Sequence, residues 1–148
     1  VHPFSFKKVS IMSKSFHNSL SLAARVLLAV LFLPAGISKL TGFTGTVGYI
    51  ASVGLPLPAV GAAAALAVEI FGSIALIVGF QTRIAGAVLA LFTLVASVFF
   101  HAFWSAAPEQ AFVQQLLFFK NIGVVGGLLV LVSSGAGAWS LDAKRQAQ

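Results

Sequence analysis

The sequence predicts an all-α membrane protein, built as an antiparallel bundle of four transmembrane helices. Of its 148 residues, 59% are hydrophobic and only 8% are charged, and the mean hydropathy is +1.02. Lipid is therefore the expected solvent for most of the chain. Four apolar segments are long enough to cross a hydrocarbon core of about 30 Å at about 1.5 Å per residue. They lie at about residues 20–40, 59–79, 84–103 and 116–135.

The first apolar segment follows a lysine-rich stretch, as the core of a signal peptide does. It is about twenty residues long, contains Arg25 and lacks a clear small-x-small cleavage site. We therefore expect a retained transmembrane helix, preceded by a tail over residues 1–19. The sequence opens with Val1 and its only methionine is Met12, so both residues stay open as the natural start.

The connections between the segments predict how the helices are joined. Only residues 80–83 link the second and third segments, so these two must form an antiparallel hairpin. The first connection is longer, and Phe43, Val47 and Ile50 recur in it at helical spacing. This pattern predicts a short interfacial helix in the first outer loop. Residues 20–138 then form one membrane domain, followed by a tail over residues 139–148.

Basic residues in the flanks and short loops predict the orientation. One side of the predicted bundle has only two of them, Lys39 and Lys120, both near helix ends. The positive-inside rule therefore predicts that both termini face the cytoplasm. The basic residues of the cytoplasmic side are Lys7, Lys8, Lys14, Arg83, Lys144 and Arg145.

Composition excludes several kinds of chemistry. The chain has no cysteine, so it carries no disulfide, thiolate nucleophile or cysteine-ligated cluster. Its three histidines are too few and too scattered to predict a metal site. The net charge of +6 comes mainly from residues that flank apolar segments, where they meet lipid headgroups. Membrane lipids are thus the expected partners and nucleic acid is not, and any redox reaction needs a borrowed cofactor.

One acidic residue, Glu69, interrupts the apolar run ALAVEIFGSIALIVG at the centre of the second segment. An ionisable group at that depth costs about 3 kcal/mol on insertion scales, so it should face protein or water. Four of its six neighbours at helical spacing are small: Ala62, Ala65, Gly72 and Ser73. This face either packs tightly against another helix or leaves room beside the carboxylate.

The first segment offers cationic partners for this acid. Arg25 and Lys39 are fourteen residues apart and share one helix face, unless a kink at Pro34 rotates them. Counted from the predicted segment ends, Arg25 lies about 8 Å and Glu69 about 16 Å from the cytoplasmic boundary. An arginine side chain could bridge that difference. A structural ion pair between Arg25 and Glu69 is therefore expected, with Lys120 as the alternative partner.

Polar residues from several segments fall at the outer-leaflet level, above Glu69. Any one of them alone is more often a snorkelling or hydrogen-bonding residue than a ligand. Together they predict an interior cavity, in which Glu69 exchanges protons and the others bind a ligand. The predicted ligand-binding residues are Lys39, His101, Lys120 and Asn121.

Six stretches occur together across nearly the entire chain, from Arg25 to Asp142. They are ARVLLAVLFLPAGISKLTGF, GYIASVGLPLP, AVEIFGSIALIVGFQTR, FFHAF, FFKNIGVVGG and SGAGAWSLD. In this combination the chain resembles the DoxX family of small bacterial inner-membrane proteins. The resemblance implies four membrane helices and an association with quinol oxidase, thiosulfate:quinone oxidoreduction or thiol and oxidative stress. It also implies that five residues are family marks: Arg25, Lys39, Glu69, Lys120 and Asn121.

Three functional hypotheses follow from these observations. The leading one is a quinone-linked redox protein or oxidoreductase subunit, in which a partner subunit carries the electrons. The second is a transporter of a small anion or lipid-like molecule, suggested by the cavity, Pro34 and the glycine-rich helices. The third is a structural subunit whose charged residues only fix assembly, and a homo-oligomer also stays open.

Overall fold

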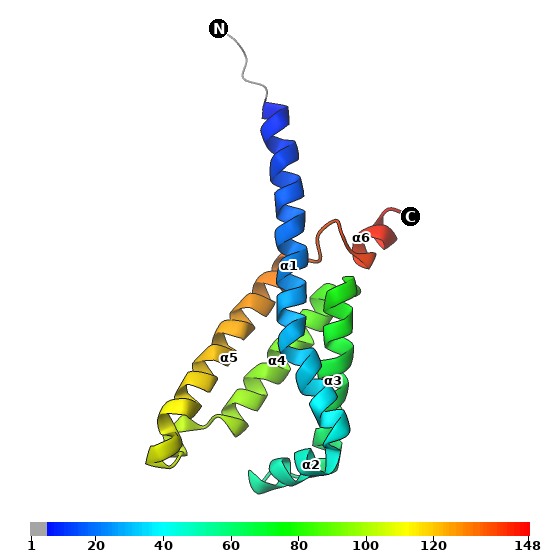
Figure 1. The fold of residues 1–148 in the computed structure, drawn as a ribbon. Helices are drawn as coiled ribbons and strands as arrows, with labels where there is room; N and C mark the ends of the chain where they lie inside the picture. The colour runs from blue at the N-terminus through cyan, green and yellow to red at the C-terminus, as the bar shows by residue number, and fades with distance from the viewer. Residues whose placement is uncertain (1–5) are drawn as a thin grey trace.

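The computed structural model describes residues 6–148, with side chains from residue 13 onward, and every regular element in that part is helical. Figure 1 shows α1 running past the other helices toward the N-terminus, with the C-terminal helix near the same end of the bundle. In chain order the elements are α1 (Phe6–Thr41), α2 (Phe43–Ser52), α3 (Pro58–Val78), α4 (Thr82–Phe100), the 3-10 helix η1 (Phe103–Ser105), α5 (Pro108–Ser134) and α6 (Leu141–Gln146).

Four helical segments within the described residues are long and apolar enough to cross a membrane: Ser13–Thr41, Pro58–Val78, Thr82–Ser105 and Pro108–Ser134. The predicted all-helical fold with four membrane-spanning segments is confirmed to this extent. Two helices begin earlier than hydropathy predicts. Helix α1 is already helical at Phe6, and α5 starts at Pro108, where proline suits the first turn and Glu109 suits the helix dipole.

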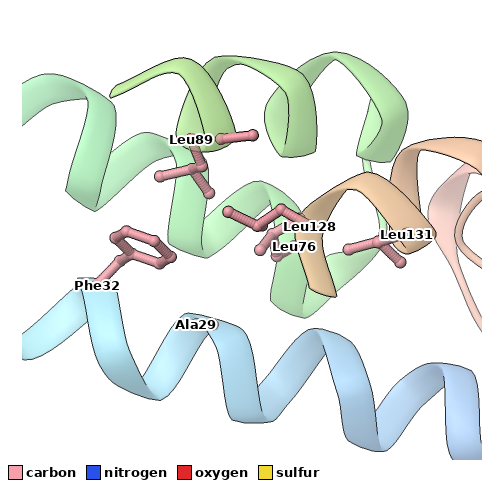
Figure 2. Packing of buried hydrophobic residues seen from close by; sticks show 7 residues of the cluster. Ala29, Phe32, Leu76, Leu89, Leu128 and Leu131 are labelled. Atoms are coloured by element: carbon pink, nitrogen blue, oxygen red, sulfur yellow. The ribbon is translucent and has the colours of Figure 1, made fainter. Parts of the chain in front are cut away.

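The four long helices share one buried cluster. Helix α1 packs along α3, α4 packs along α5, and the two pairs meet through α3 and α4. Figure 2 shows side chains from all four helices converging in the cluster. Its fully or nearly buried members are Ala29, Phe32, Leu76, Leu89, Ala90, Leu128 and Leu131. In lipid such close packing holds helices together by van der Waals contact.

Two glycines allow the helices around Glu69 to approach closely. A Cβ atom at Gly36 of α1 would lie 2.7 Å from Cγ1 of Ile70 and 3.1 Å from Cβ of Glu69. A Cβ atom at Gly72 of α3 would lie 2.9 Å from Cγ of Leu89 on α4. The small-residue face predicted around Glu69 therefore packs tightly at Gly72, whereas Ala65 and Glu69 border a cavity. This face also fixes the register of α1 against α3, with Gly36 level with Glu69.

The short helix expected after the first span is present as α2. Figure 1 shows it lying across the end of the bundle opposite the termini. Ile50 is buried beside Gly61 of α3, and the ring of Tyr49 is 5.1 Å from the ring of Phe100 at the end of α4. These contacts hold α2 against α3 and against the end of α4.

Candidate ligand-binding cavity

A cavity of about 660 Å³ lies between the five helices α1 to α5. Its volume is in the range of small-molecule and cofactor sites. Most of its wall is apolar or aromatic and includes Phe32, Phe92 and Phe100. Five polar or charged side chains that the sequence singles out also line it: Lys39, Glu69, His101, Lys120 and Asn121. Arg25, the sixth residue singled out, does not.

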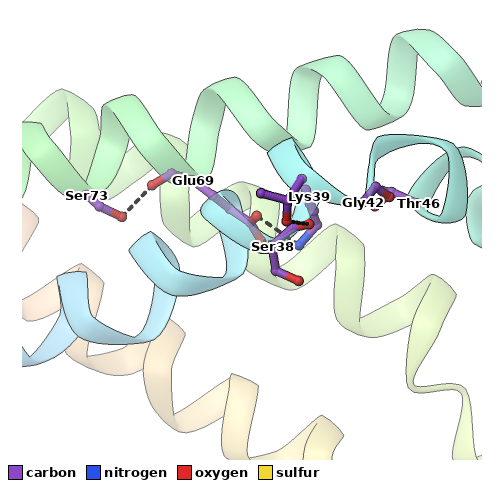
Figure 3. A network of polar contacts seen from close by, with 7 residues as sticks. Ser38, Lys39, Gly42, Thr46, Glu69 and Ser73 are labelled. Carbon is purple, nitrogen blue, oxygen red and sulfur yellow. Dashed lines mark hydrogen bonds and ion pairs between the residues drawn. The ribbon is translucent and has the colours of Figure 1, made fainter.

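Glu69 forms an ion pair with Lys39, at the wall of this cavity (Figure 3). The ammonium nitrogen Nζ of Lys39 donates to Oε1 at 3.0 Å and lies 2.8 Å from Oε2. Glu69 is only 5% exposed, whereas the Lys39 side chain is 26% exposed. Oε2 accepts no well-directed hydrogen bond within the described residues, so the carboxylate keeps unused acceptor capacity.

The expected ion pair between Arg25 and Glu69 is wrong, and Lys120 is not the partner either. Arg25 is fully buried, and its guanidinium donates to backbone carbonyls instead. One nitrogen, Nη1, lies 3.1 Å from the oxygen of Leu76 and 3.2 Å from that of Ile77, and Nη2 donates to the oxygen of Trp139.

The register of α1 against α3 explains this error. Gly36 is level with Glu69, and Arg25 precedes Gly36 by eleven residues, which is about 16 Å along the helix. That offset is beyond the reach of an arginine side chain. The depth count took residue 20 as the start of the helix, but α1 continues to Phe6. Arg25 is instead level with the last turn of α3, where it donates to the carbonyls of Leu76 and Ile77.

His101 follows α4 as its C-terminal cap residue and contributes an imidazole to the cavity wall. Its Nδ1 lies 2.9 Å from Oε1 of Gln114 on α5. In the tautomer in which Nδ1 donates to this amide oxygen, Nε2 is the acceptor that remains for the rest of the site.

Lys120 and Asn121 are adjacent residues of α5 and also line the cavity. Neither side chain makes a hydrogen bond or an ion pair within the part of the chain that the structure describes. Lys120 is exposed and Asn121 is half-buried, and an ammonium and an amide are both strong hydrogen-bond donors. These two groups are therefore available to a ligand.

A second polar cluster lies at the opposite end of the α1–α3 pair, and we call it the terminal clasp: Arg25, Gln81, Thr82, Trp139 and Asp142. The carboxylate of Asp142 accepts from the backbone N–H of Gln81 at 2.7 Å and of Thr82 at 2.9 Å, at the start of α4. Burial is the largest influence on the pKa of Asp142 and raises it, but the two backbone hydrogen bonds, the Thr82 side chain and the charge of Arg145 together outweigh burial and lower this pKa below its usual range.

Sequence reasoning missed the terminal clasp because it treated residues 139–148 as a polar tail. Glycines at positive φ were the available signal, since Gly79 and Gly135 end α3 and α5 at φ 69° and 80°. A Cβ atom at Gly79 would overlap Arg25 and Ser140. Arg83 also caps α5, because its Nη1 donates to the oxygens of Val132 and Ser133 at 2.7 Å each.

No group of three or more His, Cys, Asp or Glu side chains could hold a metal ion among the described residues. The polar groups that line the cavity include two ammonium groups, a carboxylate, an imidazole and an amide. They can bind an electronegative head and move protons.

Comparison with known proteins identifies the family. The DoxX family model matches residues 20–102. The Escherichia coli inner membrane protein YphA is 35% identical over 123 residues, which cover 83% of this chain and 88% of YphA. The E. coli inner membrane protein YqjF is 37% identical over 124 residues, covering 82% of this chain and 88% of YqjF.

A more distant relative is the Bacillus subtilis protein named "Putative oxidoreductase CatD". It is 36% identical over 87 residues, which cover 59% of this chain and 62% of CatD. No solved structure matches the chain. The family match and the two E. coli relatives extend over most of the membrane-spanning helices, and the chain is therefore an integral membrane protein that belongs to the DoxX family.

Proposed function

We propose that this chain binds a quinone in the cavity and acts as the membrane subunit of an oxidoreductase complex in the bacterial inner membrane. One observation carries the proposal: Lys39, Glu69, His101, Lys120 and Asn121, from four separate parts of the chain, meet in one largely apolar cavity. Such a wall suits a quinone, which has a flat apolar ring with two oxygens that accept hydrogen bonds. The names of CatD and of the two E. coli proteins support the reaction class and the location.

The proposed orientation is an antiparallel bundle with both termini in the cytoplasm. Both termini lie toward one end of the bundle in Figure 1, and basic residues in the flanks and loops of that end support this orientation. Lys14, Arg83, Lys144 and Arg145 are the described members of this set. The cavity then belongs to the outer leaflet, where a quinone can enter from the lipid.

The binding step follows from the free donors. Lys120 and Asn121 donate to one quinone oxygen, and the ring packs against the aromatic wall formed by Phe32, Phe92 and Phe100. His101 accepts, through Nε2, the O–H that this oxygen bears once the quinone is reduced. These groups orient the ligand and exclude water.

The chemical step needs two electrons and two protons per quinone. A flavin, haem or iron–sulfur cluster of a partner subunit supplies the electrons. As negative charge develops on the quinone oxygens, the Lys39 ammonium turns toward it and leaves Glu69. A buried carboxylate that loses its cation favours the protonated form, so Glu69 takes a proton from water and passes it to an oxygen. The second proton arrives from water, and the product is the quinol.

The test replaces Glu69 with Gln. We expect Glu69→Gln to lower quinone-dependent electron transfer in native membranes by a factor on the order of 10². Binding of decylubiquinone to the purified protein in nanodiscs, followed by quenching of tryptophan fluorescence, should change less than threefold. The exposed variant Lys144→Met is the matched control and should leave both measurements unchanged.

The proposal fails if Glu69→Gln has full quinone-dependent activity, or if the wild-type protein binds no quinone. Counterflow of a small anion in proteoliposomes would instead support the transporter hypothesis, which uses the same cavity. A protein that binds no ligand and shows no counterflow would match the structural-subunit hypothesis.

A further inference from the structure

The charges that line the cavity do not balance. The lining contains two ammonium groups, of Lys39 and Lys120, and one carboxylate, of Glu69. Lys39 lies 2.8 Å from that carboxylate, so these two charges neutralise each other. Lys120 has no ion pair within the described residues, although it belongs to the candidate membrane span Pro108–Ser134. The Lys120 side chain is exposed at the cavity wall, and a cation without an ion pair in a membrane-spanning segment is stabilised by an anion close to it.

The surroundings of Lys120 favour an anion that carries an apolar tail. Asn121 lines the same cavity and adds an amide donor, and a negatively charged oxygen strengthens hydrogen bonds from both groups. Away from Lys120 and Asn121 the cavity wall is mainly apolar and includes Phe32 and Phe92. The wall also includes Leu31, which is 39% exposed on the outside of α1, so it continues to the surface that faces lipid.

We infer that Lys120 and Asn121 form an anion subsite in this cavity, and that it binds an amphiphile with an acidic head and an alkyl tail. The head is a carboxylate or a phosphate monoester, whose oxygens accept from both side chains. This ligand class goes beyond the proposed quinone, which is neutral. The inference rests only on the cavity being a ligand site and not on redox activity.

The experiment compares ligands of equal chain length and different head charge. Purified protein in nanodiscs of zwitterionic lipid is titrated with laurate, dodecyl phosphate, dodecanol and dodecyltrimethylammonium, each competing with decylubiquinone for the cavity. We expect laurate or dodecyl phosphate to bind at least about tenfold more tightly than dodecanol, and the cationic amphiphile to bind most weakly. The two acidic ligands show whether the subsite prefers carboxylate or phosphate.

Variants then assign the preference to the subsite. Lys120→Met should abolish the advantage of the acidic heads, Lys120→Arg should retain it, and the exposed control Lys144→Met should not alter it. A thermal melt of each variant shows whether the protein is still folded. Lys120→Arg keeps the positive charge, so it shows whether the charge at this position is what the acidic heads require.

Three results would overturn the inference. If dodecanol binds as well as laurate while decylubiquinone still binds, the anion subsite is absent and the proposed function stands. If the acidic preference survives in Lys120→Met, another cation creates it. If neither the acidic amphiphiles nor decylubiquinone binds, both proposals fail together.

Discussion

Arg25 and Lys39 lie on the same face of α1, fourteen residues apart, and both contact α3, yet their surroundings differ completely. Arg25 is fully buried, and its guanidinium joins carbonyls of two distant segments, the end of α3 and Trp139. Lys39 is partly exposed and touches one acid, Glu69, at the wall of a cavity. The kink expected at Pro34 does not rotate the two cations apart.

The difference between the two ends follows from the groups that each cation meets. Carbonyls in the last turn of a helix have no intrahelical donor, and within a membrane-spanning bundle water is not available to satisfy them. A guanidinium has five N–H donors in a fixed plane, so one arginine can satisfy several such carbonyls. An ammonium that faces a single carboxylate beside a cavity can turn away from it. The terminal clasp is therefore structural, and the Lys39 end is the one that can change partners.

The largest expected effect is that of Arg25→Met. This change removes the guanidinium donors from the carbonyls of Leu76, Ile77 and Trp139, and each bond to a charged group contributes about 1.5–3 kcal/mol. Leu76 keeps one donor, the backbone N–H of Gly79 at 3.3 Å. We expect the free energy of unfolding, measured by SDS titration in mixed micelles, to fall by about 3 kcal/mol or more. Arg25→Lys should recover only part of the loss, because an ammonium cannot reproduce the planar fork.

Lys144→Met is the control for this change, since Lys144 is exposed and has no side-chain partner within the described residues. If Arg25→Met costs no more than this control, the carbonyl contacts do not stabilise the bundle. The Arg25 end of α1 would then not be the structural end of this helix.

The next largest effect is expected at the Lys39 end, from Gly36→Ala. The added methyl group meets Ile70 and Glu69 at 2.7–3.1 Å, so α1 and α3 must separate. Overpacking of this kind costs about 2 kcal/mol in the free energy of unfolding. It also pulls Lys39 away from Glu69. We therefore expect decylubiquinone to bind more weakly to Gly36→Ala than to wild type, whereas Arg25→Lys should leave this binding unchanged.

Gly48→Ala in α2 is the matched control, because nothing lies within 4 Å of the added methyl group. Alanine is the better helix former by about 1 kcal/mol, so this variant should be neutral or slightly more stable. Equal losses of stability in Gly36→Ala and Gly48→Ala would show that close approach of α1 and α3 is not what positions the ion pair.

Much of the fold could be predicted because lipid imposes one dominant rule, an apolar run of fixed length. That rule located all four spans, and helical spacing located α2. It could not locate helix ends, because polar turns continue a helix beyond its apolar part, as residues 108–115 do in α5. The membrane depths of Arg25 and Glu69 were counted from predicted helix ends, so they carried the same error.

The candidate site was also predicted only in part. The sequence placed Lys39, His101, Lys120 and Asn121 at one level above Glu69, and in the structure all five line one cavity. Which cation meets Glu69 depends on the register of α1 against α3, and that register is fixed by the contact of Gly36 with Ile70. The terminal clasp was out of reach, since it joins residues separated by more than a hundred positions through backbone carbonyls, as Arg25 joins Trp139.

The smallest expected effect concerns the terminal clasp, through Asp142→Asn. At neutral pH the Asp142 carboxylate caps the first turn of α4, and losing such a cap costs about 1 kcal/mol. The pKa of Asp142 is lower in the folded protein than in the unfolded chain, where it is about 3.9. The unfolded state therefore binds more protons at acidic pH, and the stabilisation is complete above pH 3.9 and lost as pH falls through the folded pKa.

We thus expect the difference in unfolding free energy between wild type and Asp142→Asn to be constant from about pH 7 to about pH 5 and to shrink below about pH 3.9. Glu109→Gln is the control, because Glu109 lies in the first turn of α5 but accepts no side-chain hydrogen bond within the described residues. A difference that stays constant down to about pH 2.5 would mean that the ionised carboxylate does not act as the cap. The stability of the terminal clasp would then come from Arg25 alone. The two ends of α1 would differ only in the contacts of Arg25 and of Lys39.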